Sequence, residues 1–496
     1  MNIKEAKQEI KNTVQAYLSK DDRGNYRIPS VRQRPVLLMG PPGIGKTQIM
    51  EQIAREQRIG LVAYTITHHT RQSAVGLPFI RQSEYDGKQY SVTEYTMSEI
   101  IASIYQKMED TGLREGILFI DEINCVSETL APTMLQFLQC KTFGNQAIPQ
   151  GWIIVAAGNP PEYNKSVREF DMVTLDRVRR MDIDADYAVW KEYARQQKLH
   201  GALLGYLELR PKNFYRVEAD VDGLQFVTAR GWEDLSNLLQ LYEEMDIPVT
   251  QETVYEFLRH HDVAEDVAAY IDLYHKYEED YGIGQILMGK VKSEVYARLY
   301  QAEFDERISV VHLLLDGLLL LLQQVGWEQY QTDTWYQFLV EYREGLKEYG
   351  DNAAGFYTSL LEQKQKEIED GERAGFYRQN EKDSLKELLE EWKKAQPDKG
   401  VSAKEAFEQA KKGFDCQSEQ LEEKEKQAQA ALEHAFDFME HAFEKGQEMV
   451  VFVTELTVSS EAAAFLAQHT CERYLKYNQE LLVGTRKRQL LDEINR

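Results

Sequence analysis

Residues 40–47 have the types and spacing of a loop that binds nucleotide phosphates, because they fit the pattern G-x-x-x-x-G-K-T without a mismatch. Backbone N–H groups of such a loop wrap the phosphates, and glycines allow the close approach because they lack a Cβ atom. Lys46 would add a positive charge for the β- and γ-phosphates, and Thr47 a hydroxyl ligand for Mg²⁺. The predicted phosphate-binding residues are Gly40, Pro41, Pro42, Gly43, Ile44, Gly45, Lys46 and Thr47.

Two further segments place polar side chains directly after apolar runs. Residues 117–120 are apolar and are followed by Asp121 and Glu122. Asp121 would hold Mg²⁺, and Glu122 would orient and deprotonate the water that attacks the γ-phosphate. Residues 152–157 form another apolar run, which ends at Gly158, Asn159 and Pro160. The Asn159 amide would offer a donor and an acceptor to the same water.

These side chains need a parallel sheet to bring them together. Residues 36–39 are predicted to form a buried strand before the loop, and residues 47–57 a helix after it. A strand, a glycine-rich loop and a helix form the order that phosphate binding requires, since the helix N-terminus also favours anions. The carboxyl ends of parallel strands point at one ligand crevice, so we expect the three motifs to meet there.

In this order, the three motifs resemble those of the AAA+ ATPases, and most closely those of the MoxR-like branch (AAA_5-type P-loop NTPases). The resemblance covers residues 1 to about 275. It implies an α/β fold, namely an AAA+ αβα domain with a parallel sheet, followed by a helical lid. It also implies a ring of subunits, commonly a hexamer, with ATP between neighbours. By the same resemblance, Asn159 is similar to the sensor-1 residue.

Two arginine positions are carried over from the family. The segment Leu175, Asp176 and Arg177 resembles the one that brings an arginine finger into the neighbouring site. Val178 stands where the family usually has an aromatic residue, and Arg179 and Arg180 follow, so the three arginines remain alternatives, with Arg177 preferred. Residues 228–232 resemble the sensor-2 segment and place Arg230 near the γ-phosphate, although they depart from the commoner Pro-Arg-Ala spelling.

Two hairpins are expected beside the catalytic strands. Asp86 and Gly87 lie between strand-like segments and favour a type I′ turn. Residues 142–148 form a second expected hairpin just before the Asn159 strand. In MoxR-like proteins, comparable hairpins project toward the central channel or one face of the ring, where they would act on a bound partner. The alternative is that both are passive surface hairpins.

Charge is distributed unevenly along the 496 residues, whose net charge is −24. Residues 1–250 carry 29 Lys and Arg against 33 Asp and Glu, whereas residues 251–496 carry 29 against 49. An acidic half of that size repels a phosphate backbone, so nucleic acid is an unlikely partner. The four scattered cysteines and the absence of a signal-like N-terminus favour the cytoplasm. The most apolar stretch, residues 308–322, is interpreted as a buried helix rather than a membrane span.

Beyond the nucleotide-binding motifs, the sequence is predicted to be mainly helical. We expect a nucleotide-binding domain over residues 1–185, a helical lid over 186–280, and an acidic helical domain over 281–496. Ser402 and Glu405 form a capping box before apolar residues at 3–4 spacing, which predicts a long helix in an antiparallel hairpin or coiled coil. Residues 449–456 fit either a strand or a buried helix. The domain would be a scaffold or would dock an effector.

The sequence therefore predicts an ATP-hydrolysing, MoxR-like remodeller or maturation factor that uses ATP and Mg²⁺. The resemblance implies self-assembly and a protein client, often a von Willebrand A-domain protein. The sequence shows no evident membrane segment, so we expect no membrane partner. Two alternatives remain, which are a nucleic-acid motor and a nucleotide-gated scaffold with little hydrolysis. The charge disfavours the first, and the paired acids Asp121 and Glu122 disfavour the second.

Overall fold

The computed structural model describes residues 1–68, 72, 74, 76–143, 146–163, 167, 170–220 and 223–481. The chain divides into two compact units. Unit 1 comprises Met1–Val189, Thr228–Arg230 and Glu367–Arg378, and unit 2 comprises Trp190–Val227, Gly231–Lys366 and Gln379–Arg496. The division into domains at residues 185 and 280 remains a prediction.

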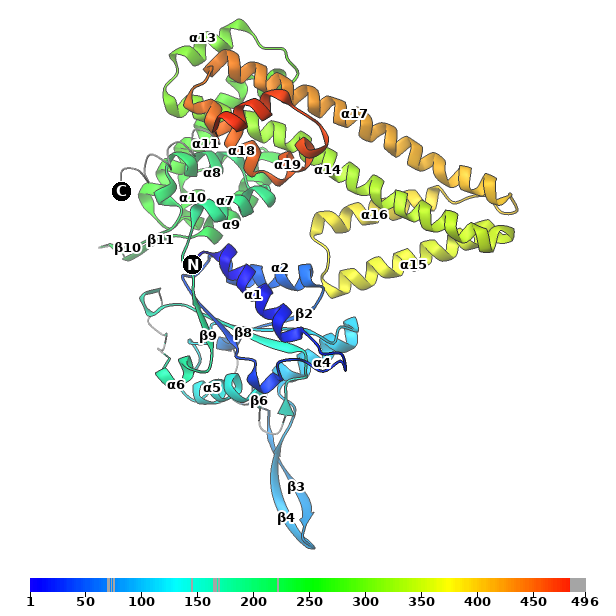
Figure 1. The fold of residues 1–496 in the computed structure, drawn as a ribbon. Helices are drawn as coiled ribbons and strands as arrows, with labels where there is room; N and C mark the ends of the chain where they lie inside the picture. The colour runs from blue at the N-terminus through cyan, green and yellow to red at the C-terminus, as the bar shows by residue number, and fades with distance from the viewer. Residues whose placement is uncertain are drawn as a thin grey trace. The chain divides into compact units, whose positions relative to one another are not determined.

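Unit 1 is built on a five-stranded parallel sheet with the strand order β2-β5-β8-β1-β9 (Figure 1). The strands predicted at 36–39, 117–120 and 152–157 are β1, β5 and β8, and they are neighbours in the sheet. The expected α/β fold is therefore confirmed. The strands are β1 (Val36–Met39), β2 (Gly60–Thr65), β5 (Gly116–Asp121), β8 (Trp152–Gly158) and β9 (Arg179–Asp182).

The central strands are apolar on both faces because helices cover both faces of the sheet. Alternate residues such as Leu118 and Ile154 belong to a core cluster with residues of α4 and α5. Their neighbours Phe119 and Val155 are equally buried, and α2 contacts β5. The helices of this unit are α1 (Ile3–Leu18), α2 (Lys46–Gln57), α4 (Glu99–Thr111), α5 (Ala131–Cys140) and α6 (Met172–Leu175).

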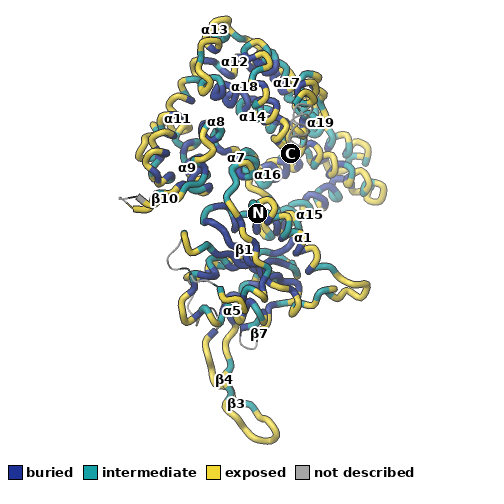
Figure 2. The backbone as a smooth tube through the Cα atoms, turned by 60° about the vertical axis from the view of Figure 1, so that its left-hand side comes forward, coloured by how far each residue is buried: buried dark blue, intermediate teal, exposed yellow. Residues whose placement is uncertain are grey.

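Both expected hairpins are present. Strands β3 (Pro78–Tyr85) and β4 (Lys88–Tyr95) pair in antiparallel register, and the turn residues Asp86 and Gly87 have φ values of 51° and 72°. Two positive φ values are what a type I′ turn requires. Figure 2 shows this ribbon exposed along nearly its whole length. Strands β6 (Thr142–Phe143) and β7 (Gln146–Ala147) form the second hairpin, whose turn residues 144 and 145 lie outside the described residues.

Unit 2 is mainly helical, as predicted for the C-terminal region, and also holds one antiparallel hairpin, β10 (Arg216–Asp220) with β11 (Gly223–Val227). Residues 449–456, which the sequence left undecided, are helical. The helices after residue 186 are α7 (Tyr187–Gln196), α8 (Gly201–Leu209), α9 (Ala229–Glu244), α10 (Gln251–Phe257), α11 (His261–Tyr281), α12 (Ile283–Leu287), α13 (Ser293–Gln301), α14 (Phe304–Tyr349), α15 (Ala353–Ala374), α16 (Gln379–Lys394), α17 (Ala403–Phe443), α18 (Gln447–Val458) and α19 (Ser460–Gln468). The 3₁₀ helices of the chain are Ser30–Arg32, Ile66–His68, Pro161–Tyr163, Pro211–Asn213 and Gly350–Asn352.

The two longest helices, α14 and α17, pack side by side in opposite directions (Figure 1). Tyr342 stacks on Phe407, whereas Glu328, further back along α14, pairs with Lys424, further along α17. The long helix predicted after Ser402 is therefore present and packs in antiparallel direction against another helix. Ser402 caps this helix, and its capping box with Glu405 is present.

Helix α14 also contains the apolar stretch 308–322. Among the described helices, it alone has the length and composition of a membrane span, unless α18 and α19, which are bent by 83° at their break, are counted as one. However, 61% of its most apolar window is buried inside the structure. Burial of that extent is typical of a core helix, which is how the sequence was interpreted.

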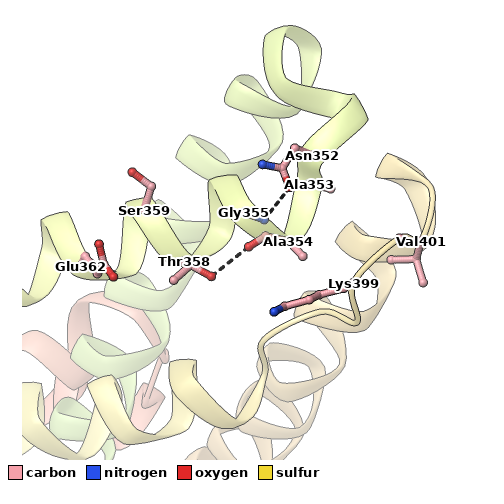
Figure 3. A pocket seen from close by; sticks show the side chains of 10 residues that line it. Asn352, Ala353, Ala354, Gly355, Thr358, Ser359, Glu362, Lys399 and Val401 are labelled. Atoms are coloured by element: carbon pink, nitrogen blue, oxygen red, sulfur yellow. Dashed lines mark hydrogen bonds between the residues drawn. The ribbon is translucent and has the colours of Figure 1, made fainter.

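A pocket lies between the start of α15 and the loop that precedes α17 (Figure 3). Its polar groups are largely engaged locally, because Asn352 Oδ1 accepts from the Gly355 N–H and Thr358 Oγ donates to the Ala354 carbonyl. Ser359, Glu362 and Lys399 of its lining are exposed to solvent. These residues do not form a constellation with catalytic chemistry.

Candidate active site

The loop between β1 and α2 has the backbone conformation that its glycines permit. Gly43 and Gly45 have φ values of 72° and 91°, a region that other residues rarely adopt. A Cβ atom on Gly40 would lie 2.6 Å from the Ile183 carbonyl oxygen, so a larger residue would displace the loop. Helix α2 begins at Lys46, directly after the turn. Its N-terminus thus lies beside the loop, as phosphate binding requires.

The Lys46 side chain is buried in this loop. Its ammonium group donates to the carbonyls of Gly40 and Pro41, at 2.8 Å each, and to Asn159 Oδ1 at 2.9 Å. Burial lowers the pKa of Lys46 to about 8; the nearby Arg230 charge lowers it too, and the Asp121 and Glu122 carboxylates raise it. The ammonium group therefore remains mostly protonated at neutral pH.

Thr47 and Asp121 come together as the sequence predicted. The Thr47 hydroxyl donates to Asp121 Oδ2 at 3.1 Å, and the other oxygen of Asp121 accepts from the Glu122 N–H at 2.9 Å. A hydroxyl and a carboxylate side by side supply the hard oxygen ligands that Mg²⁺ prefers. The donor set therefore fits Mg²⁺ held by one or two protein ligands together with phosphate oxygens.

Glu122 occupies the turn after β5 and is partly exposed. Its φ of 57° is uncommon for a residue with a side chain, and such backbone strain is often found at functional sites. Its carboxylate accepts a hydrogen bond of 2.9 Å from the Thr67 hydroxyl. Sequence reasoning missed Thr67. The available signal was its place just after β2, the strand next to β5 in the sheet.

Asn159 follows β8 and joins the same group of side chains. Its amide oxygen accepts from Lys46, while its backbone N–H and C=O both pair with the side chain of Asn124. Asn124 was also missed, although it lies only two residues after Glu122. An asparagine that pairs with backbone far away in the sequence leaves no periodic signal.

Arg230 reaches the loop through its backbone. Its N–H donates to the Gly43 carbonyl at 3.1 Å, and Thr228 lies against Gly43. The Arg230 side chain is exposed. The structure therefore places the predicted sensor-2 residue beside the phosphate loop.

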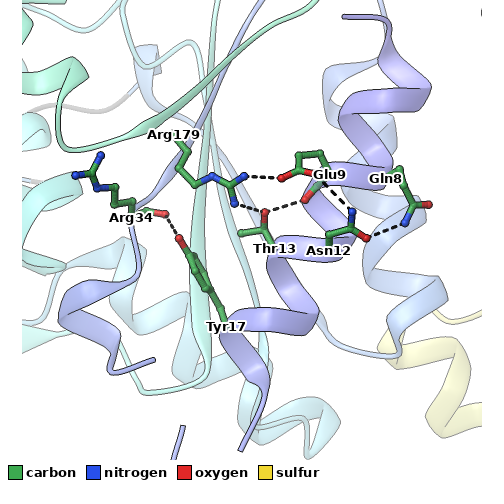
Figure 4. Close-up of polar contacts among 7 residues, drawn as sticks. All are labelled: Gln8, Glu9, Asn12, Thr13, Tyr17, Arg34 and Arg179. Atoms are coloured by element: carbon green, nitrogen blue, oxygen red, sulfur yellow. Dashed lines mark hydrogen bonds and ion pairs between the residues drawn. The ribbon is translucent and has the colours of Figure 1, made fainter. Parts of the chain in front are cut away.

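The three alternative finger arginines have different surroundings. Arg179 lies on β9, and its guanidinium binds Glu9 at 2.5 Å and Thr13 at 2.7 Å on α1 (Figure 4). Arg180 pairs with Asp182 at 2.7 Å on the same strand. Arg177 precedes the strand, is exposed, and has no side-chain hydrogen bond or ion pair among the described residues. Arg177 therefore lacks the direct side-chain hydrogen bonds and ion pairs that Arg179 and Arg180 make among the described residues, although it interacts electrostatically with Asp171.

The assembled group can bind and polarise a phosphorylated ligand. A buried ammonium, a hydroxyl beside a carboxylate, a second carboxylate and an amide converge at the carboxyl ends of β1, β5 and β8. In phosphoryl transfer, positioning and charge stabilisation supply nearly all of the catalysis, and these groups supply both.

One segment of the chain, which holds most of this site, matches a family model. No curated protein matches the chain. Residues 36–175 match the family model described as "ATPase family associated with various cellular activities (AAA)". The matched segment contains β1, β5 and β8 with the loop and the acids between them. The match and the five-stranded parallel sheet together support an AAA+ P-loop ATPase domain, a nucleotide-binding and ATP-hydrolysing unit, in this part of the chain.

Proposed function

We propose that this protein is an ATP-hydrolysing AAA+ remodeller of the MoxR-like branch that acts on a partner protein. The observation that carries the proposal is the convergence of Lys46, the Thr47–Asp121 pair, Glu122 and Asn159 at one edge of the sheet. A protein that only binds nucleotide has no need for a second carboxylate beside the first. The pair therefore favours hydrolysis over a nucleotide-gated scaffold.

The residues divide the work of hydrolysis. The loop amides and the Lys46 ammonium would bind the phosphates, and Thr47 and Asp121 would hold Mg²⁺, which neutralises phosphate charge when bound. The Glu122 carboxylate would orient the attacking water and accept its proton at Oε. The Asn159 amide would fix the same water or the γ-phosphate, and Arg230 would contact the γ-phosphate.

Arg177 would complete the site of a neighbouring copy in a ring, which the resemblance suggests is a hexamer. Two features support its place at an interface. Its guanidinium is exposed and makes no side-chain hydrogen bond or ion pair among the described residues, and the short helix α6 just before it exposes two apolar side chains, Met172 at 83% and Val173 at 52%. Apolar side chains exposed beside an exposed cation suit a contact between subunits.

The β3–β4 ribbon is the element that we propose contacts the client. Nothing in the described part of unit 1 covers it, and it exposes Ile80 at 74%, Tyr85 at 58% and Tyr90 at 48%. Aromatic side chains are enriched in protein interfaces. The resemblance suggests a von Willebrand A-domain protein as partner, in a cytoplasmic maturation step.

The deciding test replaces Glu122 with glutamine. Glu122→Gln keeps the size of the side chain and removes the base, so phosphate release should fall by about 10³-fold or more while ATP is still bound. Glu109→Gln, an exposed carboxylate on α4, is the matched control and should hydrolyse ATP at the wild-type rate. Full phosphate release by Glu122→Gln would contradict the assignment of the base.

Two further measurements separate the remaining alternatives. Light scattering of Glu122→Gln with Mg²⁺-ATP should show an assembly larger than the protein without nucleotide. DNA should leave the ATPase rate unchanged, because the chain carries a net charge of −24. Stimulation of hydrolysis by DNA would instead support the nucleic-acid motor.

A further inference from the structure

The turn after β5 is tied to Asn159 by one buried side chain, that of Asn124. Asn124 is 2% exposed. Its Nδ2 donates to the Asn159 carbonyl at 2.8 Å, and its Oδ1 accepts from the Asn159 N–H at 3.3 Å. One amide side chain thus binds both backbone groups of the residue whose own amide faces Lys46.

This pairing continues the sheet beyond the point where its backbone ladder stops. Strands β5 and β8 pair in register up to Ile120 and Ala156, and the Ile123 N–H then donates to the Ala157 carbonyl at 2.9 Å. The backbone leaves the ladder at Glu122, whose φ is 57°. An asparagine side chain has the same donor and acceptor as a peptide group. The Asn124 side chain therefore makes the two hydrogen bonds to Asn159 that a continued strand backbone would make.

Gly158 makes room for this contact. A Cβ atom on Gly158 would lie 2.6 Å from Asn124 Oδ1, closer than real Cβ atoms come. The absence of a side chain at Gly158 thus leaves space for the Asn124 amide. The turn itself is closed by a hydrogen bond of 2.8 Å from the Cys125 N–H to the Glu122 carbonyl. Glu122 and Asn124 therefore belong to one short turn, which bonds to β8 through the Ile123 N–H and to Asn159 through the Asn124 side chain.

We infer that Asn124 is a positioning residue for ATP hydrolysis, which holds Asn159 at a fixed place relative to Glu122. The inference rests on the proposed function, because it assigns Asn159 to the reacting water or the γ-phosphate. Asn124 itself contacts neither Lys46 nor the Thr47–Asp121 pair in the described hydrogen bonds, so it acts through Asn159. Its removal should slow the chemical step and leave nucleotide binding in place.

The test compares Asn124→Ala and Asn124→Asp with wild type in steady-state hydrolysis and in binding of a fluorescent ATP analogue. A misplacement of about 1 Å can cost roughly 100-fold in rate, so we expect kcat to fall by about 10- to 100-fold. KM and analogue affinity should change by less than about threefold, since the phosphate loop is untouched. Asn124→Asp keeps the shape and the acceptor but loses the donor. It should likewise lower kcat while KM and analogue affinity change little. Ser127→Ala, an exposed polar residue of the same loop, is the control and should keep the wild-type kcat.

A double-mutant cycle distinguishes positioning of Asn159 from general destabilisation. In an Asn159→Ala background the amide to be positioned is gone, so adding Asn124→Ala should lower kcat by less than about twofold. An Asn124→Ala effect of full size in that background, or an unchanged kcat in the wild-type background, would overturn the inference. If wild type itself fails to hydrolyse ATP, the proposed function fails instead. Melting temperatures of the variants show whether each one folds.

Discussion

Two groups of charged and polar side chains in this molecule differ in their surroundings. The first is the site group at the ends of β1, β5 and β8, where Asp121, Glu122 and Asn159 are partly exposed. The second is a buried charge cluster in unit 2, which we define as Lys191, Arg195, Glu208, His312, Asp316 and Glu455. Both contain paired charges and displaced pKa values. Only the first lies beside a glycine loop that a ligand can approach.

The buried charge cluster is joined by ion pairs, although Arg195 Nε and His312 Nε2 are buried without a hydrogen-bond partner in the described part of the chain. Glu455 on α18, 5% exposed, pairs with both Lys191 and Arg195 of α7, and Lys191 also pairs with Glu208 of α8. Burial holds the pKa of His312 well below its usual value, with the neighbouring Arg195 and Lys191 charges adding to the effect. These charges join helices of one unit, and the side chains of Arg195 and Glu455 are only 6% and 5% exposed. A displaced pKa therefore identifies a catalytic group only where the group is also accessible.

Among the substitutions that test this comparison, the largest loss of ATPase activity is expected for Arg177, which would complete the site group of a neighbouring copy. Arg177→Ala should lower kcat by about 10³- to 10⁵-fold, as removal of an arginine finger does, because the guanidinium would act in the neighbour's site. Its melting temperature should be close to that of wild type, since Arg177 is exposed and only the charge of Asp171 acts on it among the described interactions. Arg180→Ala, which loses only an exposed pair with Asp182, is the matched control. An equal loss of kcat in both variants would contradict the assignment of Arg177 as the arginine finger.

The opposite pattern is expected in the buried charge cluster. Arg195→Met leaves the buried Glu455 with fewer positive partners, and breaking such a pair costs about 3–5 kcal/mol of unfolding free energy. Chemical denaturation should show that loss, while ATPase activity per folded molecule stays near wild type. Joining Arg195→Met to Glu455→Leu should recover much of the stability, because the Glu455 charge is then absent and Lys191 still pairs with Glu208. A double variant no more stable than Arg195→Met alone would contradict this account.

The sequence predicted the site better than it predicted the packing around it. Residues 40–47 and the pair Asp121 and Glu122 were recognisable because phosphate chemistry fixes both residue type and spacing. The strands that carry them were recognisable because burial on both faces demands continuous apolar runs. Motifs of this kind are local, so a single segment contains the whole signal.

The missed features depend on residues that are distant in the chain. The contacts of Thr67 with Glu122 and of Asn124 with Asn159 could be recognised only in the folded sheet, where β2, β5 and β8 are neighbours. Arg179 could not be separated from Arg177 in the sequence, because its partners Glu9 and Thr13 lie about 170 residues earlier. The edge strand β9 was likewise not predicted, since Arg179–Asp182 is charged and short.

The smallest expected effect is on the stability of unit 2 and concerns Glu243 and His275. These side chains are more exposed than the buried charge cluster and lie outside the site group. Glu243 on α9 accepts from the Nε2 atoms of His200 at 2.7 Å and His275 at 3.1 Å. Burial raises the pKa of Glu243, but the hydrogen bonds from the two imidazoles prevail and lower it to about 2. The hydrogen bond to Glu243 raises the pKa of His275 above its ordinary 6.5, although burial opposes this.

The two shifts define the pH range in which the pair stabilises the fold. The Glu243 contribution is present above its ordinary pKa of 4.5 and is lost as the pH falls toward 2. The His275 contribution is complete below pH 6.5 and is lost as the pH rises through its raised pKa. His275→Gln should therefore lose the most stability between about pH 4.5 and 6.5, by roughly 0.5–1 kcal/mol since both side chains are partly exposed. Denaturation curves measured across this pH range check the prediction. A loss for His275→Gln that is independent of pH would mean that packing rather than charge joins these helices.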